Sequence, residues 1–228
     1  MVSKIKKVRL VIVSISLLAV VGIALPIVRA SDTTQLNQTI NSGTLAADTK
    51  DANRDTVVSP SFSMGATSLS FDCQTTSGTI GSDSQRIYVN NPDVADAGWT
   101  LTVAATSGAT ALWQNGGSTQ NYDFNDTSTS GCTDGADADS RAGRMTIDAS
   151  AGTLTADCSS CSSTNITKGS SANFDQGVTD SITILNAAAG SDDVGRWYLT
   201  GVNVDQTVPA EQAADSYTVN LTVTVTAS

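Results

Sequence analysis

The feature of this sequence that most restricts its fold is a strict alternation of residue types near the C-terminus. In the stretch YTVNLTVTV, residues 217–225, every second side chain is apolar or aromatic, and the residues between them are threonine or asparagine. Successive side chains of a β-strand point to opposite faces of a sheet, so this period of two predicts a strand with one buried and one solvated face. Such strands are typical of antiparallel sheets.

Shorter runs of the same kind recur along the chain, and no window after residue 31 shows the period that predicts a helix. The further predicted strands cover residues 68–72, 85–90, 99–105, 144–149, 181–187 and 196–204. Clusters of Gly, Asn, Asp and Pro separate them. Short strands at this spacing, without helices between them, predict an all-β fold with a single antiparallel β-sandwich.

The N-terminal segment has the composition of an export signal. Basic residues precede the apolar run LVIVSISLLAVVGIALPIV at residues 10–28. The pattern predicts a signal peptide over residues 1–30 that is cleaved before Ser31, and a secreted protein at the extracellular cell surface. The alternative is an uncleaved anchor, because the run is just long enough to cross a bilayer. No later run is long enough for a membrane helix, so we expect no membrane contact after cleavage.

Two regions are expected after the signal peptide. Residues 31–56 are polar and weakly periodic, which predicts an extended or partly ordered lead-in. Residues 57–228 hold the alternating runs and are predicted to form the β-sandwich domain. A single core is normal for a chain of this length.

Removal of residues 1–30 changes the charge of the chain. Five of the 12 Lys and Arg residues lie there and none of the 22 acidic residues, so seven basic residues remain and the net charge is −15. Such a chain repels phosphate backbones, which argues against a nucleic-acid partner. Cations, cationic polymers and basic proteins are the partners that this charge favours. Solubility outside the cell is the alternative explanation of the charge.

The cysteines predict two disulfide bonds, because an exported chain with an even number of cysteines usually pairs them. The four are Cys73, Cys132, Cys158 and Cys161. We expect Cys158 or Cys161 to pair back to Cys132 or Cys73. The alternative is a redox-active Cys-x-x-Cys motif, which needs a βαβ context and a helix after the first cysteine. Residues 158–161 lie instead in a loop rich in Ser and Thr.

Tryptophan is scarce, and two of the three residues share a local pattern. Trp99 and Leu101, like Trp197 and Leu199, are spaced by two in predicted strands, so each pair shares one face. We expect these indoles to cover a core of small side chains. Trp113 stands beside a Gly-Gly turn and is the better candidate for an exposed platform that contacts a ligand such as a sugar ring.

These elements resemble the WxL domain of Gram-positive surface proteins. The matching features are the signal segment, the stretch AGWTLTV at residues 97–103 and the approach to the terminal strand, and together they span most of residues 60–228. In the family the second motif lies in the terminal strand itself. Here Trp197-Tyr198-Leu199 stands one strand earlier, and the terminal strand carries valine in that place. The resemblance implies a β-rich domain attached non-covalently to cell-wall peptidoglycan.

The chain contains no histidine, which excludes Ser–His–Asp and Cys–His enzymes. A zinc enzyme would have to use cysteines that are better used in disulfides. A carboxylate pair of the glycosidase kind stays open, but nearly all aspartates lie in turns, which favours exposure and ordinary acidity. We therefore expect no enzymatic activity and no catalytic residues.

One loop concentrates oxygen ligands. Residues 122–143 carry acidic side chains that offer hard ligands for calcium, namely Asp123, Asp126, Asp134, Asp137 and Asp139. Their spacing differs from the EF-hand loop, which has ligands at every second position and a closing glutamate. A solvated acidic loop held by Cys132 is the interpretation that this spacing favours, and a calcium site is the alternative. We therefore expect no cofactor, with calcium in this loop as the one alternative.

Three functional hypotheses follow. The first is an exported, non-catalytic surface protein that binds a cell-wall polymer such as peptidoglycan, or other surface proteins. The second is a self-associating fibre or pilus-like subunit, in which the terminal strand or the lead-in pairs with a neighbour's sheet edge. The third is a secreted, calcium-dependent adhesin or lectin that uses Trp113 and the acidic loop.

Overall fold

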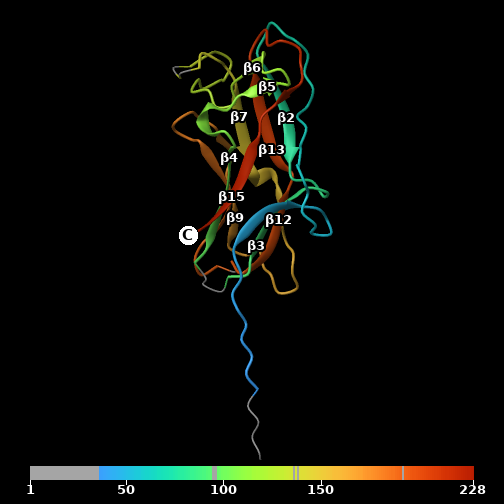
Figure 1. Ribbon diagram of the computed structural model, residues 1–228. Helices are drawn as coiled ribbons and strands as arrows, with labels where there is room; N and C mark the ends of the chain where they lie inside the picture. Colours follow the sequence, from blue (N-terminus) through green and yellow to red (C-terminus); the bar gives the residue numbers. More distant parts are fainter. Residues whose placement is uncertain (1–35, 94–96, 136, 138, 192) are drawn as a thin grey trace, which may run out of the picture. The chain divides into compact units, whose positions relative to one another are not determined.

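The structure of the chain is a computed structural model (Figure 1). It describes residues 36–93, 97–135, 137, 139–191 and 193–228. The predicted signal peptide and residues 31–35 lie outside the described residues. The part that holds the strands runs from Asn41 to Ser228. A search of the described residues finds no helix that is both long enough and apolar enough to cross a membrane.

Antiparallel strands build this part, and the only other regular elements among the described residues are two single turns of 3-10 helix, at Gly108–Thr110 and Ala149–Ala151. The predicted all-β fold class is therefore confirmed. The strands form four sheets within the described part of the chain.

The first two sheets together form one bent layer. The first has the order β1 (Ala46–Lys50), β3 (Arg86–Asn91), β12 (Gly195–Thr200), β8 (Thr153–Ala156). The second has the order β10 (Ala172–Asn173), β7 (Arg144–Asp148), β13 (Val202–Val208), β2 (Gln74–Ile80). Only Gly201 separates β12 from β13 in the sequence. β12 pairs with β3 and β8, and β13 pairs with β2 and β7, so consecutive strands continue from one sheet into the other on both sides. The pairing thus passes from one sheet into the other at a bend.

Gly81, between β2 and β3, makes this bend possible. The N–H of Gly201 donates to the carbonyl oxygen of Gly81 at 2.7 Å. Gly81 has a φ of +81°, and a Cβ atom there would lie 2.8 Å from the carbonyl oxygen of Leu199. Both the backbone angle and the close approach of two strands therefore require glycine.

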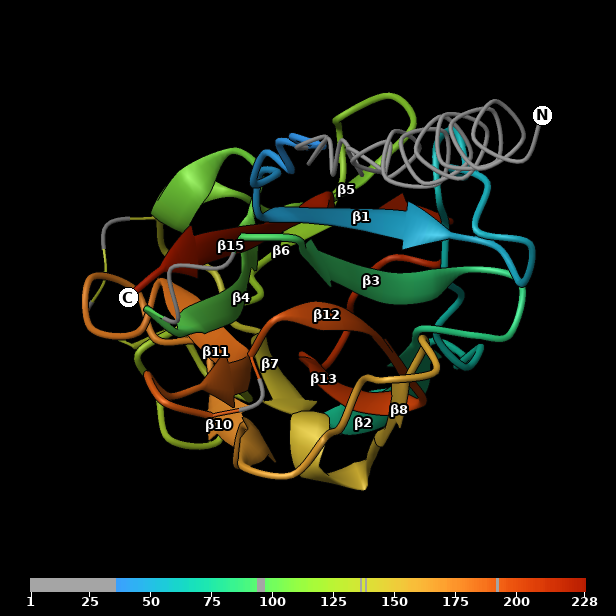
Figure 2. The same cartoon turned by 90° about the horizontal axis from the view of Figure 1, so that it is seen from below.

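The second layer is the sheet β15 (Leu221–Ala227), β4 (Trp99–Ala105), β11 (Ser181–Ala187), β9 (Ile166–Lys168). It faces the bent layer, and Trp99 of β4 meets Trp197 of β12 with ring centroids 5.6 Å apart. Both indoles are fully buried, together with Leu101 and Leu199. The edge strands β1 and β15 come close to each other where the two layers meet (Figures 1 and 2).

The fourth sheet is small and lies at the end of the sandwich that carries β5 and β6 in Figure 1. Its order is β14 (Tyr217–Thr218), β5 (Trp113–Asn115), β6 (Asn121–Tyr122). The loop with the acidic residues leaves this sheet after β6 and returns to the bent layer at β7.

Four sequence-based predictions differ from the structure by more than one residue. The predicted terminal strand, residues 217–225, is divided: Tyr217–Thr218 pairs with β5 in a separate small sheet, and the strand that starts at Leu221 pairs with β4. Residues 68–72 form no strand, and Phe71 is 79% exposed. The chain meets β2 just before this segment, through an isolated bridge between Met64 and Gly78. The lead-in was expected to be extended or partly ordered up to residue 56, but its residues 46–50 form β1, which pairs with β3. The predicted strand 196–204 is divided at Gly201.

The disulfide pairing that we expected was also wrong. Cys73 pairs with Cys132, and Cys158 pairs with Cys161. The cause is a tight turn, in which the N–H of Cys161 donates to the carbonyl oxygen of Cys158 at 3.2 Å and the two Cα atoms lie 5.1 Å apart. This turn brings Cys158 and Cys161 close enough to form a disulfide with each other, and Cys73 and Cys132 form the second one. Two disulfides are compatible with a protein exported to an oxidising compartment.

We predict that Gly81→Ala lowers the free energy of unfolding by about 2 kcal/mol or more, because a side chain there is strained by the positive φ and meets the backbone of β12. Gly116→Ala is the matched control, since a Cβ at Gly116 meets no atom within 4 Å. Urea unfolding of both variants measures the difference. Equal stabilities would contradict the role of Gly81 in the bend.

We also predict that the two disulfides differ in their contribution to stability. Cys73–Cys132 closes a loop with a sequence separation of 59, and Cys158–Cys161 one of 3. On the chain-entropy estimate, replacing both cysteines of a pair by serine costs roughly 4 kcal/mol for the long loop and roughly 2 kcal/mol for the short one. Denaturant midpoints of the two double variants test this order, and the reverse order would contradict it.

Candidate functional site

The acidic loop is held at its base by backbone pairing. The N–H of Asp123 donates to the carbonyl oxygen of Ala142 at 2.9 Å, and the N–H of Asp126 donates to that of Gly143 at 3.0 Å. The N–H of Met145 donates to the carbonyl oxygen of Phe124 at 2.6 Å. The segment after β6 therefore runs antiparallel to the start of β7. This pairing places the first acidic residues of the loop beside the last ones.

Three of the five predicted ligands converge as a result. One carboxylate oxygen from each of Asp123, Asp137 and Asp139 lies within 4.8 Å of the others. Asp123 is fully buried, and the other two are half-buried. At an effective dielectric constant of about 20, two negative charges at such a distance repel by about 3 to 4 kcal/mol. A bound cation or proton would relieve this repulsion.

Several side-chain oxygen atoms of the acidic loop, two of them in the cluster, are buried without a hydrogen-bond partner among the described residues. They are Oδ2 of Asp123, Oδ2 of Asp126, Oδ2 of Asp137 and Oδ1 of Asn125. The other oxygen of Asp123 accepts hydrogen bonds from the N–H groups of Phe124 and Asn125 at 2.7 and 3.2 Å. Buried polar atoms nearly always have a partner, so four such oxygens within one loop indicate a missing ligand.

The pKa values of these carboxyl groups follow from their surroundings. Burial raises the pKa of Asp123 to about 7, and repulsion by Asp139 and Asp137 adds to this shift. The hydrogen bonds from the N–H groups of Asn125 and Phe124 stabilise the charged form and oppose it. Burial also raises the pKa of Asp126 and of Asp139, and the charge of Asp137 adds to both shifts. Burial and mutual repulsion therefore disfavour the state in which all these carboxyl groups are ionised and no cation is bound.

The remaining charged residues of the loop lie outside the cluster. Asp134 is exposed at its rim, where its charge still raises the pKa of Asp126 and Asp139. The guanidinium of Arg144 points elsewhere, since it donates to the carbonyl oxygen of Ser128 at 2.9 Å and forms an ion pair with Asp175 at 3.4 Å. Arg144 therefore does not face the cluster, whereas the charge of the exposed Arg141 lowers the pKa of Asp139 and offsets part of the repulsion there.

A second feature is a groove of about 960 Å³ on the open side of the sandwich. Its floor is made of core side chains from both layers, among them Ile87, Val103 and Val204. One wall is the segment of residues 60–70, and the opposite wall is β15 with the residues that precede it. Asp48 and Asp215 are the only charged residues that line it. The groove is thus nearly neutral within a strongly acidic domain.

Aromatic rings stand at one end of this groove. Trp113, Tyr122 and Tyr217 all line it. Trp113 is stacked on Tyr122 at a centroid distance of 5.9 Å and an interplanar angle of 8°, and Tyr217 meets the edge of Tyr122 at 5.2 Å. Trp113 is half-buried, so it forms part of a packed aromatic wall rather than a free platform.

One side chain connects the groove to the acidic cluster. Gln206 is fully buried in β13; its Nε2 donates to the carbonyl oxygen of Asp123 at 3.1 Å, and its Oε1 accepts from Nε1 of Trp113 at 2.9 Å. The side chain of Gln206 therefore links the backbone of Asp123 to the aromatic wall through two hydrogen bonds.

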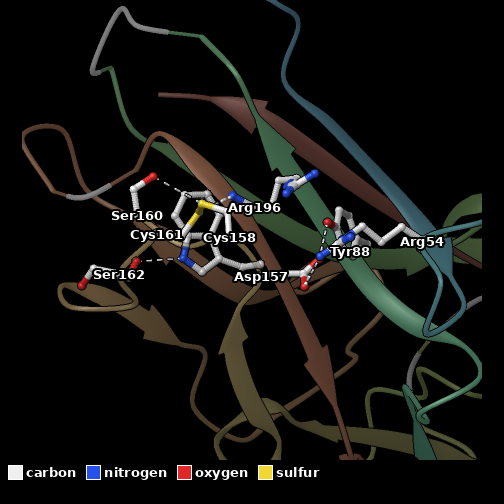
Figure 3. The surroundings of a disulfide bond; sticks show 9 residues. Arg54, Tyr88, Asp157, Cys158, Ser160, Cys161, Ser162 and Arg196 are labelled. Atoms are coloured by element: carbon white, nitrogen blue, oxygen red, sulfur yellow. Dashed lines mark hydrogen bonds and ion pairs between the residues drawn. A yellow bond between two sulfur atoms is a disulfide. The ribbon is translucent and has the colours of Figure 1, made fainter.

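The Cys158–Cys161 bond lies in a different environment, on the loop after β8 (Figure 3). The carboxylate of Asp157 accepts from Nε and Nη2 of Arg54 at 2.6 and 3.0 Å and from the hydroxyl of Tyr88 at 2.6 Å. Sγ of Cys161 accepts from the N–H of Arg196 at 3.2 Å. These contacts join the loop to the segment after β1 and to the bent layer. No helix follows Cys158, so the βαβ context of a redox motif is missing among the described residues.

Comparison with known proteins gives no identification: no family model, no curated protein and no solved structure matches this chain.

Sequence reasoning missed the groove and Gln206. The groove depends on the path of residues 60–70, which carry no periodic signal apart from the wrongly predicted strand. Gln206 could have been found, because it continues the inward-facing series Val202, Val204 in β13 and is the one amide in that series.

We predict a pH-dependent contribution from Asp157. The hydrogen bonds from Arg54 lower the pKa of Asp157, so its carboxylate stabilises the fold above the ordinary pKa near 3.9, and the contribution is lost as the pH falls through the lowered value. Asp157→Asn should cost about 0.5 to 1 kcal/mol at pH 7 and almost nothing near pH 2. Thermal unfolding across this pH range measures the loss.

Arg54→Gln provides the check on this assignment. It should raise the pKa of Asp157 towards its ordinary value in a carboxyl NMR titration and reproduce the pH dependence. A loss of stability that is equal at pH 2 and pH 7 would show that Asp157 acts through packing alone.

Proposed function

We propose that this chain is an exported, non-catalytic surface protein that binds an extended, uncharged polymer in the groove beside β15, with a glycan strand of the cell wall as the occupant. The observation that carries the proposal is the groove itself. It has a volume of about 960 Å³, it is nearly free of charge, and stacked aromatic rings form part of its lining.

The chemistry of the lining supports a carbohydrate. Amide and hydroxyl side chains such as Gln74, Thr76 and Asn220 stand beside apolar ones such as Met64 and Val223. Sugars present hydroxyl groups along their edges and apolar faces to aromatic rings, so a mixed lining suits them. The net charge of −15 that is expected for the exported chain opposes polyanions, which favours an uncharged polymer over a phosphate-rich one.

Two features of the sequence support the same function. The resemblance to WxL domains implies attachment to peptidoglycan, and the signal segment implies export. The lack of histidine removes the commonest general base, which supports binding rather than catalysis.

The test is co-sedimentation of the secreted protein with purified Gram-positive cell walls. We predict saturable pelleting that Val223→Tyr weakens by about tenfold or more, because Val223 faces the groove and a larger ring there occupies it. Thr224→Tyr is the matched control, since Thr224 is the next residue of β15 and lies on its exposed face. Thermal unfolding of both variants establishes that they are folded.

Absence of pelleting by the wild-type protein would refute wall binding. Equal binding by the two variants would place the contact outside the groove. Competition by soluble wall fragments and by acidic wall polymers separates a neutral glycan from a polyanion as the occupant.

A second function is favoured by one observation, the edge of β15, which comes close to β1 without pairing with it. Within the described residues, no strand pairs with its outer edge, and the extended residues 36–40 expose Leu36 and Ile40, which are 91% and 86% accessible. An arm of this kind from a second copy could add a strand to β15 and form a fibre. Concentration-dependent assembly on a sizing column, without wall binding, would favour this function.

A further inference from the structure

We propose that the loop between β6 and β7 binds one calcium ion between the carboxylates of Asp123, Asp137 and Asp139. The site stands on two independent observations. The first is the convergence of the three carboxylates within 4.8 Å of one another. The second is the set of buried oxygens that have no partner among the described residues, two of them on the fully buried side chains of Asp123 and Asp126.

The number and type of oxygen atoms suit calcium. Calcium takes six to eight oxygen ligands from carboxylates, amides, backbone carbonyls and water. The three converging carboxylates supply the charge. Asn125 and Asp126, which follow Asp123 closely in the sequence, also carry a buried oxygen without a partner among the described residues. Zinc and copper are disfavoured because the chain has no histidine and its four cysteines are in disulfides.

The local backbone prepares the site before any ion binds. The hydrogen bonds of Asp123 and Asp126 to residues 142–143 fix one side of the loop. Cys132 ties the middle of the loop to Cys73. The N–H of Arg141 donates to Oδ1 of Asp139 at 2.9 Å, which orients that carboxylate. The ion thus closes a loop whose two sides are already held in place.

The site also reaches the groove, and this part of the inference rests on the proposed function. Asp123 is connected to Trp113 through Gln206, and Trp113 stacks on Tyr122, which immediately precedes Asp123. An ion that fixes Asp123 therefore fixes the aromatic end of the groove. We expect calcium to strengthen wall binding.

The direct test is calorimetric titration of calcium into the full secreted protein after treatment with a chelator, with no polymer present. We expect one equivalent of calcium to bind with a dissociation constant of about 10⁻³ M or lower, the range of extracellular calcium modules, and the melting temperature to rise in calcium. Magnesium at the same concentration should give a smaller rise, because its small octahedral shell fits an irregular loop poorly.

Asp123→Asn and Asp137→Asn should weaken calcium binding by about tenfold or more. Asparagine at 123 keeps an oxygen that accepts from Phe124 and Asn125 and removes only the buried charge, so the calcium-free variant is expected to fold. Asp134→Asn is the matched control, since it removes the same charge from the exposed rim of the loop. Its affinity should stay within about threefold of the wild type.

The absence of calcium-linked heat and of a shift in melting temperature in the wild-type protein would overturn the site. Unchanged calcium binding in Asp123→Asn and Asp137→Asn would overturn it as well. Because these measurements contain no polymer, they are independent of wall binding. Calcium binding without wall pelleting would refute the proposed function and leave the calcium site standing.

Discussion

The contact between Trp99 and Trp197 is the interaction on which the two-layer arrangement depends. Most other core positions hold Val, Ile, Leu or Ala, and the two indoles, one from each layer, are the largest fully buried side chains. Each indole N–H is satisfied by a loop carbonyl, that of Asp193 at 3.1 Å for Trp99 and that of Ser162 at 2.8 Å for Trp197. The pair therefore joins the layers and also positions the loops around them. At the other end the aromatic residues stack on one another along one wall, and the interior stays open as the groove.

Local patterns predicted the strands whose side chains alternate clearly. β4 and β11 begin and end at the predicted residues. β4 buries every second side chain, and β11 does so up to Ile184, where a register shift also buries Leu185. β2 was missed because its sequence, QTTSGTI, has no alternating apolar residues; its pairing with β13 holds it in the sheet. The prediction for residues 68–72 was wrong for the opposite reason: this segment has the alternating pattern of a strand, but it lies outside β2 and forms no strand. These cases depend on tertiary pairing, which a local pattern cannot express.

The candidate sites show the same division. The acidic residues could be grouped from the sequence because they share one loop, but their convergence depends on the pairing of Asp123 and Asp126 with residues 142–143. The spacing rule of the EF-hand does not apply to a site whose ligands come from the two ends of a loop. The groove could not be predicted, since its walls come from segments that are about 150 residues apart in the sequence. The disulfide pairing depended on a turn of four residues at Cys158.

The Cys73–Cys132 bond has a consequence for when the fold is completed. One of its cysteines follows the segment that forms a wall of the groove, and the other lies in the acidic loop, so a single covalent link holds both. In a reducing cytosol this link is open, and the two segments are tied only by their non-covalent contacts. Under the proposed export, the bond can close only once the chain has reached an oxidising compartment, so the two segments would gain this covalent link after the strands have paired.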